Sequence, residues 1–359
     1  MNHLATFGGA FVVALLTTAF VRGVASRFGV LAMPGGRRKH QAAVPLMGGV
    51  ALFIALALVM VGLSSLGWLP GDHIKAKYIV GIIAAAALLS FGGALDDRYD
   101  LKPKQQILWP LMAVFAVIVV GVGVDFITNP FGGLIKLNDY VVTAVWIDGI
   151  PYKLTVLADI FTLAWLMTMT YTTKFLDGLD GLVAGLTMIG GLVIAALSMM
   201  REVSQPDTAL LALAIAGVFA GFLVFNFYPA RMFLGEGGST MAGFLLGVLA
   251  VISGGKIATT LLVLGLPLID AVLVVIRRLL RGQPPFKGDR SHLHFLLVDN
   301  GLPHRQAVLL YWFLALVFGV STLILRGPQK VAALGVAVSL VLAVVAGLLI
   351  VRKRRHDNA

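Results

Sequence analysis

Three carboxylates stand together where an apolar run ends. The run YIVGIIAAAALLSFGG leads directly into ALDDRYDL, which contains Asp96, Asp97 and Asp100. If a helix continues past Asp97, Asp96 and Asp100 share one of its faces, and two unpaired carboxylates would repel each other there. A divalent cation or a basic group would remove that repulsion. The alternative is an interfacial helix end whose acids are neutralised by nearby basic residues, namely Arg98, Lys102 and Lys104.

Two further segments place acidic residues among glycines. In TKFLDGLDGLVAG, Asp177 and Asp180 have the spacing of neighbours on a helix, and Lys174 stands close enough to pair with an acid or a phosphate. In FLGEGGST, Glu236 lies between glycines that precede a predicted helix, so the loop would present backbone N–H groups to an anion. A metal ion between Glu236 and a phosphate would reconcile their charges. Each segment also has the composition of an ordinary turn.

Two basic segments complete the set. PGGRRKHQAAVPLMGG follows the first apolar run and contains Arg37, Arg38, Lys39 and His40. DRSHLHFLL contains Asp289, Arg290, His292 and His294. The two histidines diverge on a helix but point the same way in an extended segment, where they could bind phosphate. Positive-inside topology or contact with anionic lipid explains the first segment equally well, and a solvated basic loop explains the second.

The elements that must position these residues are apolar helices. The 359 residues are 59% hydrophobic and 13% charged, whereas soluble globular domains carry about 25% charged residues. Apolar runs of about 20 residues, long enough to cross a bilayer, recur from end to end. We expect an all-α polytopic membrane protein with a single domain over 1–359 and about eleven transmembrane helices. The predicted spans are 4–21, 46–68, 78–95, 106–124, 157–173, 181–199, 208–228, 240–253, 257–276, 306–325 and 331–351. Asp270 lies inside the ninth, where an ionisable residue usually has a partner or a function.

The distribution of basic residues predicts the orientation of these spans. With the N-terminus outside and the C-terminus inside, most of the 28 Lys and Arg residues lie in cytoplasmic segments. These include the 277–305 H-x-H loop and the basic tail 352–359. All five polar segments then follow odd-numbered spans, so we expect one cytoplasmic active site. Span 240–253 is short, and its loss would invert everything after it. The outer loop 125–156 has two β-branched arms around Asp148-Gly149, which predict a small extracytoplasmic β-hairpin.

Clustered acids, basic residues and glycine loops suit phosphoryl transfer with Mg²⁺. The chain has no cysteine and no G-x-x-x-x-G-K-[ST] loop, which argues against a thiolate metal site and a P-loop ATPase. The net charge of +11 fits an anionic substrate or anionic lipid, and no nucleic-acid partner is expected. The residues therefore predict a magnesium-dependent transfer onto a lipid phosphate or alcohol.

The five segments together resemble the motifs of the polyprenyl-phosphate N-acetylhexosamine-1-phosphate transferases (glycosyltransferase family 4). RRKHQAAVPLMGG is similar to the family's R-K-x-H…P…GG loop, DDRYDLKPKQQ to its DDxxD motif and FLDGLDGL to its D-G-x-D-G loop. FNFYPARMFLGEGGS resembles FNxxPAxxFMGDxGS, and DRSHLHFLL resembles D-R-x-H-x-H. The R-K-x-H element and the single H-x-H place the resemblance in the WecA/TagO-like branch.

The resemblance implies transfer of N-acetylglucosamine-1-phosphate from UDP-GlcNAc to undecaprenyl (polyprenyl) phosphate. Polyprenyl-diphospho-GlcNAc and UMP would be the products, in the first membrane step of cell-envelope polysaccharide synthesis such as O-antigen or teichoic acid. It implies Mg²⁺, with Mn²⁺ as a substitute, and an inner (plasma) membrane location, and the family is often homodimeric. The metal ligands would be Asp97 and Glu236. The implied catalytic residues are Asp96, Asp97, Asp177, Asp180, His292 and His294. The implied substrate-binding residues are Arg37, Arg38, His40, Lys104, Lys174, Asn226, Gly237, Ser239, Asp289 and Arg290.

Three positions depart from the family pattern. Lys174 replaces an Asn, Glu236 replaces the metal-binding Asp, and Ala32 replaces an acidic residue. These departures leave open another UDP-N-acetylhexosamine or UDP-MurNAc-pentapeptide as donor. A transporter or flippase for an anionic or lipid-linked solute, or a non-catalytic scaffold that binds carrier lipid, are the alternatives from other classes.

Overall fold

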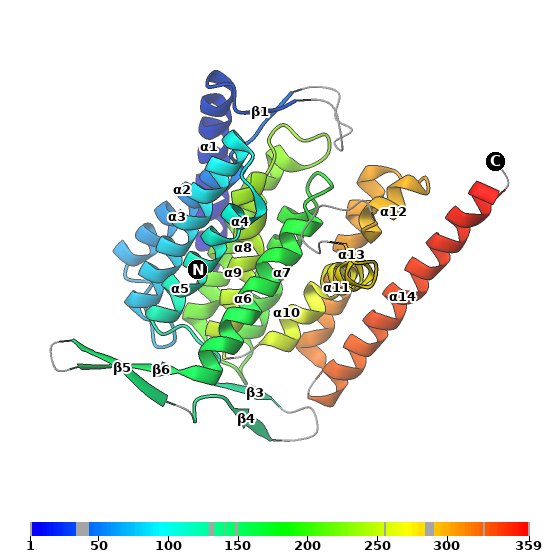
Figure 1. The fold of residues 1–359 in the computed structure, drawn as a ribbon. Coiled ribbons are helices and arrows are strands. Elements are labelled where there is room, and N and C mark those ends of the chain that lie inside the picture. The colour runs from blue at the N-terminus through cyan, green and yellow to red at the C-terminus, as the bar shows by residue number, and fades with distance from the viewer. Residues whose placement is uncertain are drawn as a thin grey trace.

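Figure 1 shows the computed structural model of the protein. The structure describes residues 2–33, 43–128, 133–139, 141–147, 150–254, 256–283, 291–325 and 327–357. Eight residues singled out by the sequence lie outside this part of the chain: Arg37, Arg38, Lys39, His40, Asp148, Gly149, Asp289 and Arg290.

The described chain is mostly helical, because an apolar segment in lipid must satisfy its backbone hydrogen bonds internally. The helices are α1 (Asn2–Arg27), α2 (Gly48–Ser65), α3 (Ala76–Tyr99), α4 (Pro103–Gln106), α5 (Leu108–Val119), α6 (Val156–Leu176), α7 (Leu182–Met199), α8 (Pro206–Asn226), α9 (Gly235–Ile252), α10 (Ile257–Val263), α11 (Gly265–Leu280), α12 (Leu293–Asp299), α13 (His304–Ile324) and α14 (Pro328–Asp357).

Within the described residues, eight helices are long and apolar enough to cross a membrane, and the bent pair α10–α11 would make a ninth. This confirms a multi-pass helical membrane protein. Helix α5, with 12 residues, and α6, which carries several threonines, are not among the eight. The count of eleven spans and the N-out, C-in orientation remain predictions.

Two predicted spans differ from the helices that form. The span predicted at 257–276 is broken into α10 and α11, which are bent by 80° at Leu264. Pro267 has no N–H to donate back to Val263, so a continuous helix would lose a hydrogen bond there. The short span predicted at 240–253 begins earlier, at Gly235, and α9 therefore reaches 18 residues.

Short antiparallel strands form three two-stranded sheets in the described chain. The pairs are β1 (Leu31–Ala32) with β2 (Val44–Pro45), β3 (Phe126–Thr128) with β4 (Leu134–Lys136), and β5 (Val141–Ile147) with β6 (Ile150–Thr155). Ile147 lies opposite Ile150 in the β5–β6 pair, which occupies the segment predicted as a hairpin. Strands β3–β6 lie at one end of the bundle, and β1, α4 and α12 lie at the other (Figure 1). The extracytoplasmic placement of these strands stays a prediction.

Helix α9 is the centre of the bundle and packs against α2, α3, α6 and α7. Its approach to α2 and α3 is possible only because glycines face one another. A Cβ added at Gly93 on α3 would lie 2.1 Å from the backbone nitrogen of Gly237, and one added at Gly49 on α2 would lie 2.6 Å from that of Gly238. Such close backbone contact is typical of small residues between membrane helices. It brings the carboxyl end of α3 against the amino end of α9.

We expect the substitution Gly93→Ala to lower stability by about 1–3 kcal/mol, because the added methyl group collides with backbone rather than with a movable side chain. The measurement is the thermal unfolding midpoint of the purified protein in detergent. Gly62→Ala on α2 is the matched control, since no atom lies within 4 Å of its added Cβ. Equal midpoints for the two variants would contradict the close-contact interpretation.

Candidate active site

A single carboxylate joins three segments at the end of the bundle that holds α4 and α12. Asp97, near the end of α3, accepts hydrogen bonds from the backbone N–H of Met47 (3.0 Å), just before α2, and of Glu236 (3.1 Å), in the first turn of α9. The positive end of the α9 dipole favours a negative charge at this position. The sequence predicted that the glycine-rich segment around Glu236 presents N–H groups to an anion, and in the structure the Asp97 carboxylate accepts one of them.

Asp96 lies beside Asp97 but faces a different set of partners. Its Oδ1 accepts hydrogen bonds from the backbone N–H of Leu101 (3.0 Å) and from Nε2 of Gln106 (2.8 Å). Helix α3 ends at Tyr99, and Asp100 follows as its C-cap residue, with a left-handed φ of 50° and its N–H donating to the carbonyl of Asp96 (2.9 Å).

Lys174 and Glu236 form an ion pair, with Nζ 2.5 Å from Oε1. The side chains are 16% and 17% exposed, so this charge pair is largely withdrawn from water. Lys174 Nζ also donates to Oε1 of Gln106 (2.9 Å) and lies 5.3 Å from the ring centroid of Tyr171. Two of the three positions that depart from the family pattern are thus in direct contact.

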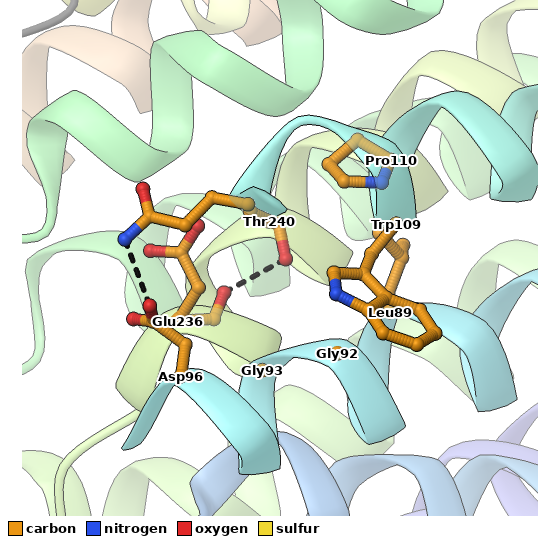
Figure 2. A pocket seen from close by; sticks show the side chains of 9 residues that line it. Leu89, Gly92, Gly93, Asp96, Trp109, Pro110, Glu236 and Thr240 are labelled. Atoms are coloured by element: carbon orange, nitrogen blue, oxygen red, sulfur yellow. Dashed lines mark hydrogen bonds between the residues drawn. The ribbon is translucent and has the colours of Figure 1, made fainter. Parts of the chain in front are cut away.

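Glu236 and Asp96 line a small pocket with a polar side and an apolar side (Figure 2). Asp96 and Glu236 lie on one side of it. Gln106 also lines the pocket and donates from Nε2 to Oδ1 of Asp96. Leu89, Trp109 and Pro110 form an apolar wall on the other side, and Gly92 and Gly93 of α3 lie between the two sides. Because the polar side carries two carboxylates, an anionic group there requires a cation beside it.

The D-G-x-D segment is a turn between α6 and α7, so Asp177 and Asp180 are not helical neighbours as predicted. Gly181, with φ +82°, permits the left-handed conformation at the start of α7. Asp177 is exposed. Asp180 Oδ2 accepts from the backbone N–H of Ala230 (3.0 Å), and its own N–H donates to Nε2 of His304 (2.9 Å).

Asn226 ties the same turn to the segment before α9. Its Oδ1 accepts from the N–H of Gly181 (3.1 Å), and its Nδ2 donates to the carbonyl of Met232 (3.0 Å). Both ends of this buried amide therefore bind backbone. Asn226 acts on the site by positioning two loops.

Asp270, which lies inside the ninth predicted span, has His292 as its partner. Its Oδ2 lies 2.9 Å from Nδ1 of His292, and its Oδ1 accepts from the backbone N–H of Leu293 (2.8 Å). Both side chains are buried. Because the carboxylate binds Nδ1, it fixes the orientation of the ring and leaves Nε2 as the nitrogen available to a ligand.

His294 is fully buried beside His292, with the two rings stacked at 5.6 Å. Its ring packs against Gly178 of the D-G-x-D turn, where an added Cβ would meet Nε2. Neither ring nitrogen has a hydrogen-bond partner among the described residues. Burial lowers the pKa of His294 well below the ordinary histidine value, and the nearby rings of His292 and His304 act in the same direction.

Three other residues predicted to bind substrate are Gly237, Ser239 and Lys104. Gly237 and Ser239 belong to the first turns of α9 rather than to a loop, and the Ser239 hydroxyl donates to the carbonyl of Gly235 (3.0 Å). The prediction of an open glycine-rich loop is wrong, because the glycines are used for helix packing. Lys104 is exposed on α4 at the same end of the bundle.

Sequence reasoning missed Gln106 and His304. Gln106, which joins Asp96 to Lys174, stood within the motif DDRYDLKPKQQ but has no charge to mark it. His304 follows Pro303 at the start of α13, and nothing in its local pattern connects it to Asp180.

The residue types fit Mg²⁺. Within the described chain, no three His, Cys, Asp or Glu side chains are grouped so as to hold a metal ion alone. Mg²⁺, however, usually takes one or two carboxylates and completes its shell with water and substrate phosphates. Glu236 lines the pocket together with Asp96, and Asp97 lies next to Glu236 as the acceptor of its backbone N–H, so carboxylates of the kind that Mg²⁺ prefers are present here.

Known proteins share this pattern of sequence. Residues 79–254 match the model of glycosyl transferase family 4. The chain is 30% identical to a probable undecaprenyl-phosphate N-acetylglucosaminyl 1-phosphate transferase of Bacillus subtilis, over 88% of this chain and 84% of the relative. It is 30% identical to a decaprenyl-phosphate N-acetylglucosaminephosphotransferase of Mycolicibacterium smegmatis, over 100% and 91%. An undecaprenyl-phosphate alpha-N-acetylglucosaminyl 1-phosphate transferase of Escherichia coli K12 is 28% identical over 86% and 81%.

We expect Asp97→Asn to destabilise the protein by about 1.5–3 kcal/mol, because both backbone N–H groups would lose a charged acceptor and one of them would face an amide N–H₂. Asp100→Asn is the control, since Asp100 is exposed and asparagine tolerates its left-handed φ. The readout is the thermal unfolding midpoint without ligands. An unchanged midpoint for Asp97→Asn would show that this carboxylate does not hold the three segments together.

Proposed function

Because the chain belongs to glycosyl transferase family 4, we propose that it transfers N-acetylglucosamine 1-phosphate from UDP-N-acetylglucosamine to a polyprenyl phosphate. An oxygen of the lipid phosphate attacks the phosphorus that carries the sugar, the bond from that phosphorus to UMP breaks, and UMP leaves. The observation that carries this proposal is the near full-length similarity to two relatives whose names specify transfer of this group to undecaprenyl or decaprenyl phosphate.

Three acidic residues, Asp96, Asp97 and Glu236, have two roles in this proposal. Asp97 and Glu236 would hold Mg²⁺, or Mn²⁺ in its place, and the ion would neutralise charge on the donor diphosphate. Asp96 keeps the acceptor phosphate ionised, and its Oδ1 is anchored by Leu101 and Gln106 for that purpose. Since Asp96 and Asp97 are adjacent and interact, the pair rather than either residue is the safer unit of assignment.

The histidines and the D-G-x-D turn act on the donor. His292, whose Nδ1 is bound to Asp270, is assigned to contact the diphosphate through Nε2. His294 packs against the turn that bears Asp177. We assign Asp177, which is exposed, to orienting the nucleotide. Asp180 holds the turn through Ala230 and His304. Exposed Lys104 is assigned to the acceptor phosphate, and Arg37, Arg38, His40, Asp289 and Arg290 remain assigned to substrate binding on the resemblance alone.

We place the active site on the cytoplasmic side of the inner (plasma) membrane, in an early step of cell-envelope polysaccharide synthesis, with a homodimer as the working assembly. The three relatives named above are transferases, which gives a transporter or flippase no support. Another UDP-N-acetylhexosamine or UDP-MurNAc-pentapeptide remains the alternative donor, because Lys174 and Glu236 stand at the centre of the site.

Purified protein incubated with radiolabelled UDP-N-acetylglucosamine, Mg²⁺ and undecaprenyl phosphate should form a butanol-extractable labelled lipid. Added UMP should reverse the reaction, because the bond broken and the bond formed are both phosphoanhydrides. The same assay with UDP-GalNAc and UDP-MurNAc-pentapeptide identifies the donor. Monodisperse, folded protein that labels no lipid with any of these donors would refute the proposal.

Asp270→Asn should lower turnover by about two orders of magnitude or more, because the amide no longer fixes the charge and tautomer of His292. Asp270→Glu should recover part of the activity. The ¹⁵N chemical shifts of the His292 ring report its tautomer directly, and a purely structural role would not require them to change. Asp139→Asn, exposed and on the segment near β4, is the control. Near-native turnover by folded Asp270→Asn protein would remove the assigned role.

A further inference from the structure

The Lys174 ammonium has an unusual position for a lysine. It lies 2.5 Å from Oε1 of Glu236 and 2.9 Å from Oε1 of Gln106, and its side chain is only 16% exposed. The ring of Tyr171 covers it at 5.3 Å. Lysine side chains normally extend their charge into water, so this one is held in place by specific partners.

Glu236 needs a cation nearby. Its backbone N–H is bonded to Asp97, and its side chain borders the same pocket as Asp96 (Figure 2). Three carboxylates therefore meet within two adjoining helix ends, and a withdrawn carboxylate without a counter-charge is costly. Lys174 supplies that counter-charge in the structure.

The same carboxylate is one of the two proposed metal ligands. A divalent cation bound to Glu236 would lie within a few ångströms of the ammonium, and two positive groups at that separation repel strongly away from bulk water. Lys174 and the metal ion are thus alternative partners of Glu236.

We propose that Lys174 is a resident cation that competes with the divalent metal ion for Glu236, and that the diphosphate of the sugar nucleotide takes up the ammonium when the metal enters. The long, flexible lysine stem permits this change of partner. Metal and nucleotide would then bind cooperatively. The nucleotide would take the Lys174 ammonium away from Glu236, and the metal ion would release the ammonium to the diphosphate. The nucleotide half of this inference rests on the proposed function, whereas the competition for Glu236 does not.

The test measures binding of Mn²⁺ by electron paramagnetic resonance, which requires no turnover. Without nucleotide, Lys174→Met should bind Mn²⁺ at least tenfold more tightly than the natural chain, about 1.4 kcal/mol. Lys174→Arg keeps the charge and should bind like the natural chain. Lys102→Met removes an exposed positive charge at the same end of the bundle and should change the affinity by less than threefold.

A second measurement uses the unaltered protein, so that the inference stays testable if Lys174→Met fails to fold. With saturating UDP, the natural chain should bind Mn²⁺ at least tenfold more tightly than it does without nucleotide. The Mn²⁺ bound by free UDP is measured separately and subtracted. Equal or weaker Mn²⁺ binding by folded Lys174→Met, absence of coupling with UDP, or no Mn²⁺ binding under any condition would each overturn the inference. Failure of lipid labelling with these results intact would instead refute the transfer reaction.

Discussion

The hydrogen bonds to Asp97 are the constraint on which the rest of the site depends. One carboxylate accepts N–H groups from the segment before α2 and from the first turn of α9, while belonging itself to α3. This arrangement requires the ends of three helices to meet within the length of one side chain. It also combines structure and chemistry in one residue, because the same oxygens are the proposed metal ligands.

The glycines explain how three helix ends come so close. At Gly49, Gly93 and Gly237 the helices touch at their backbones, so no side chain separates the carboxyl end of α3 from the amino end of α9. The positive helix end then faces Asp97, and the acids are stabilised by backbone and by one lysine rather than by bulk water. Packing and electrostatics therefore depend on each other at this point.

The sequence alone predicts much of this architecture, because apolar runs identify membrane helices and the alternation of loops places five polar segments on one side. Contacts in the structure join the segments of Met47, Asp97, Lys174, Asp180 and Glu236, as that alternation implies. The partners of Asp270 and of Lys174 could not be predicted, since they depend on the rotation and depth of separate helices. The break between α10 and α11 and the early start of α9 likewise reflect tertiary contacts that local apolarity does not report.

The contact between Lys174 and Glu236 also affects the charge of this site. Each position differs from the pattern of the similar family, and each carries the counter-charge of the other. Lys174 adds a positive charge where the family pattern has a neutral amide, whereas Glu236 keeps the negative charge of an aspartate on a longer side chain. The exchange at position 174 therefore changes the net charge of the site, and the exchange at position 236 changes only how far the carboxylate reaches.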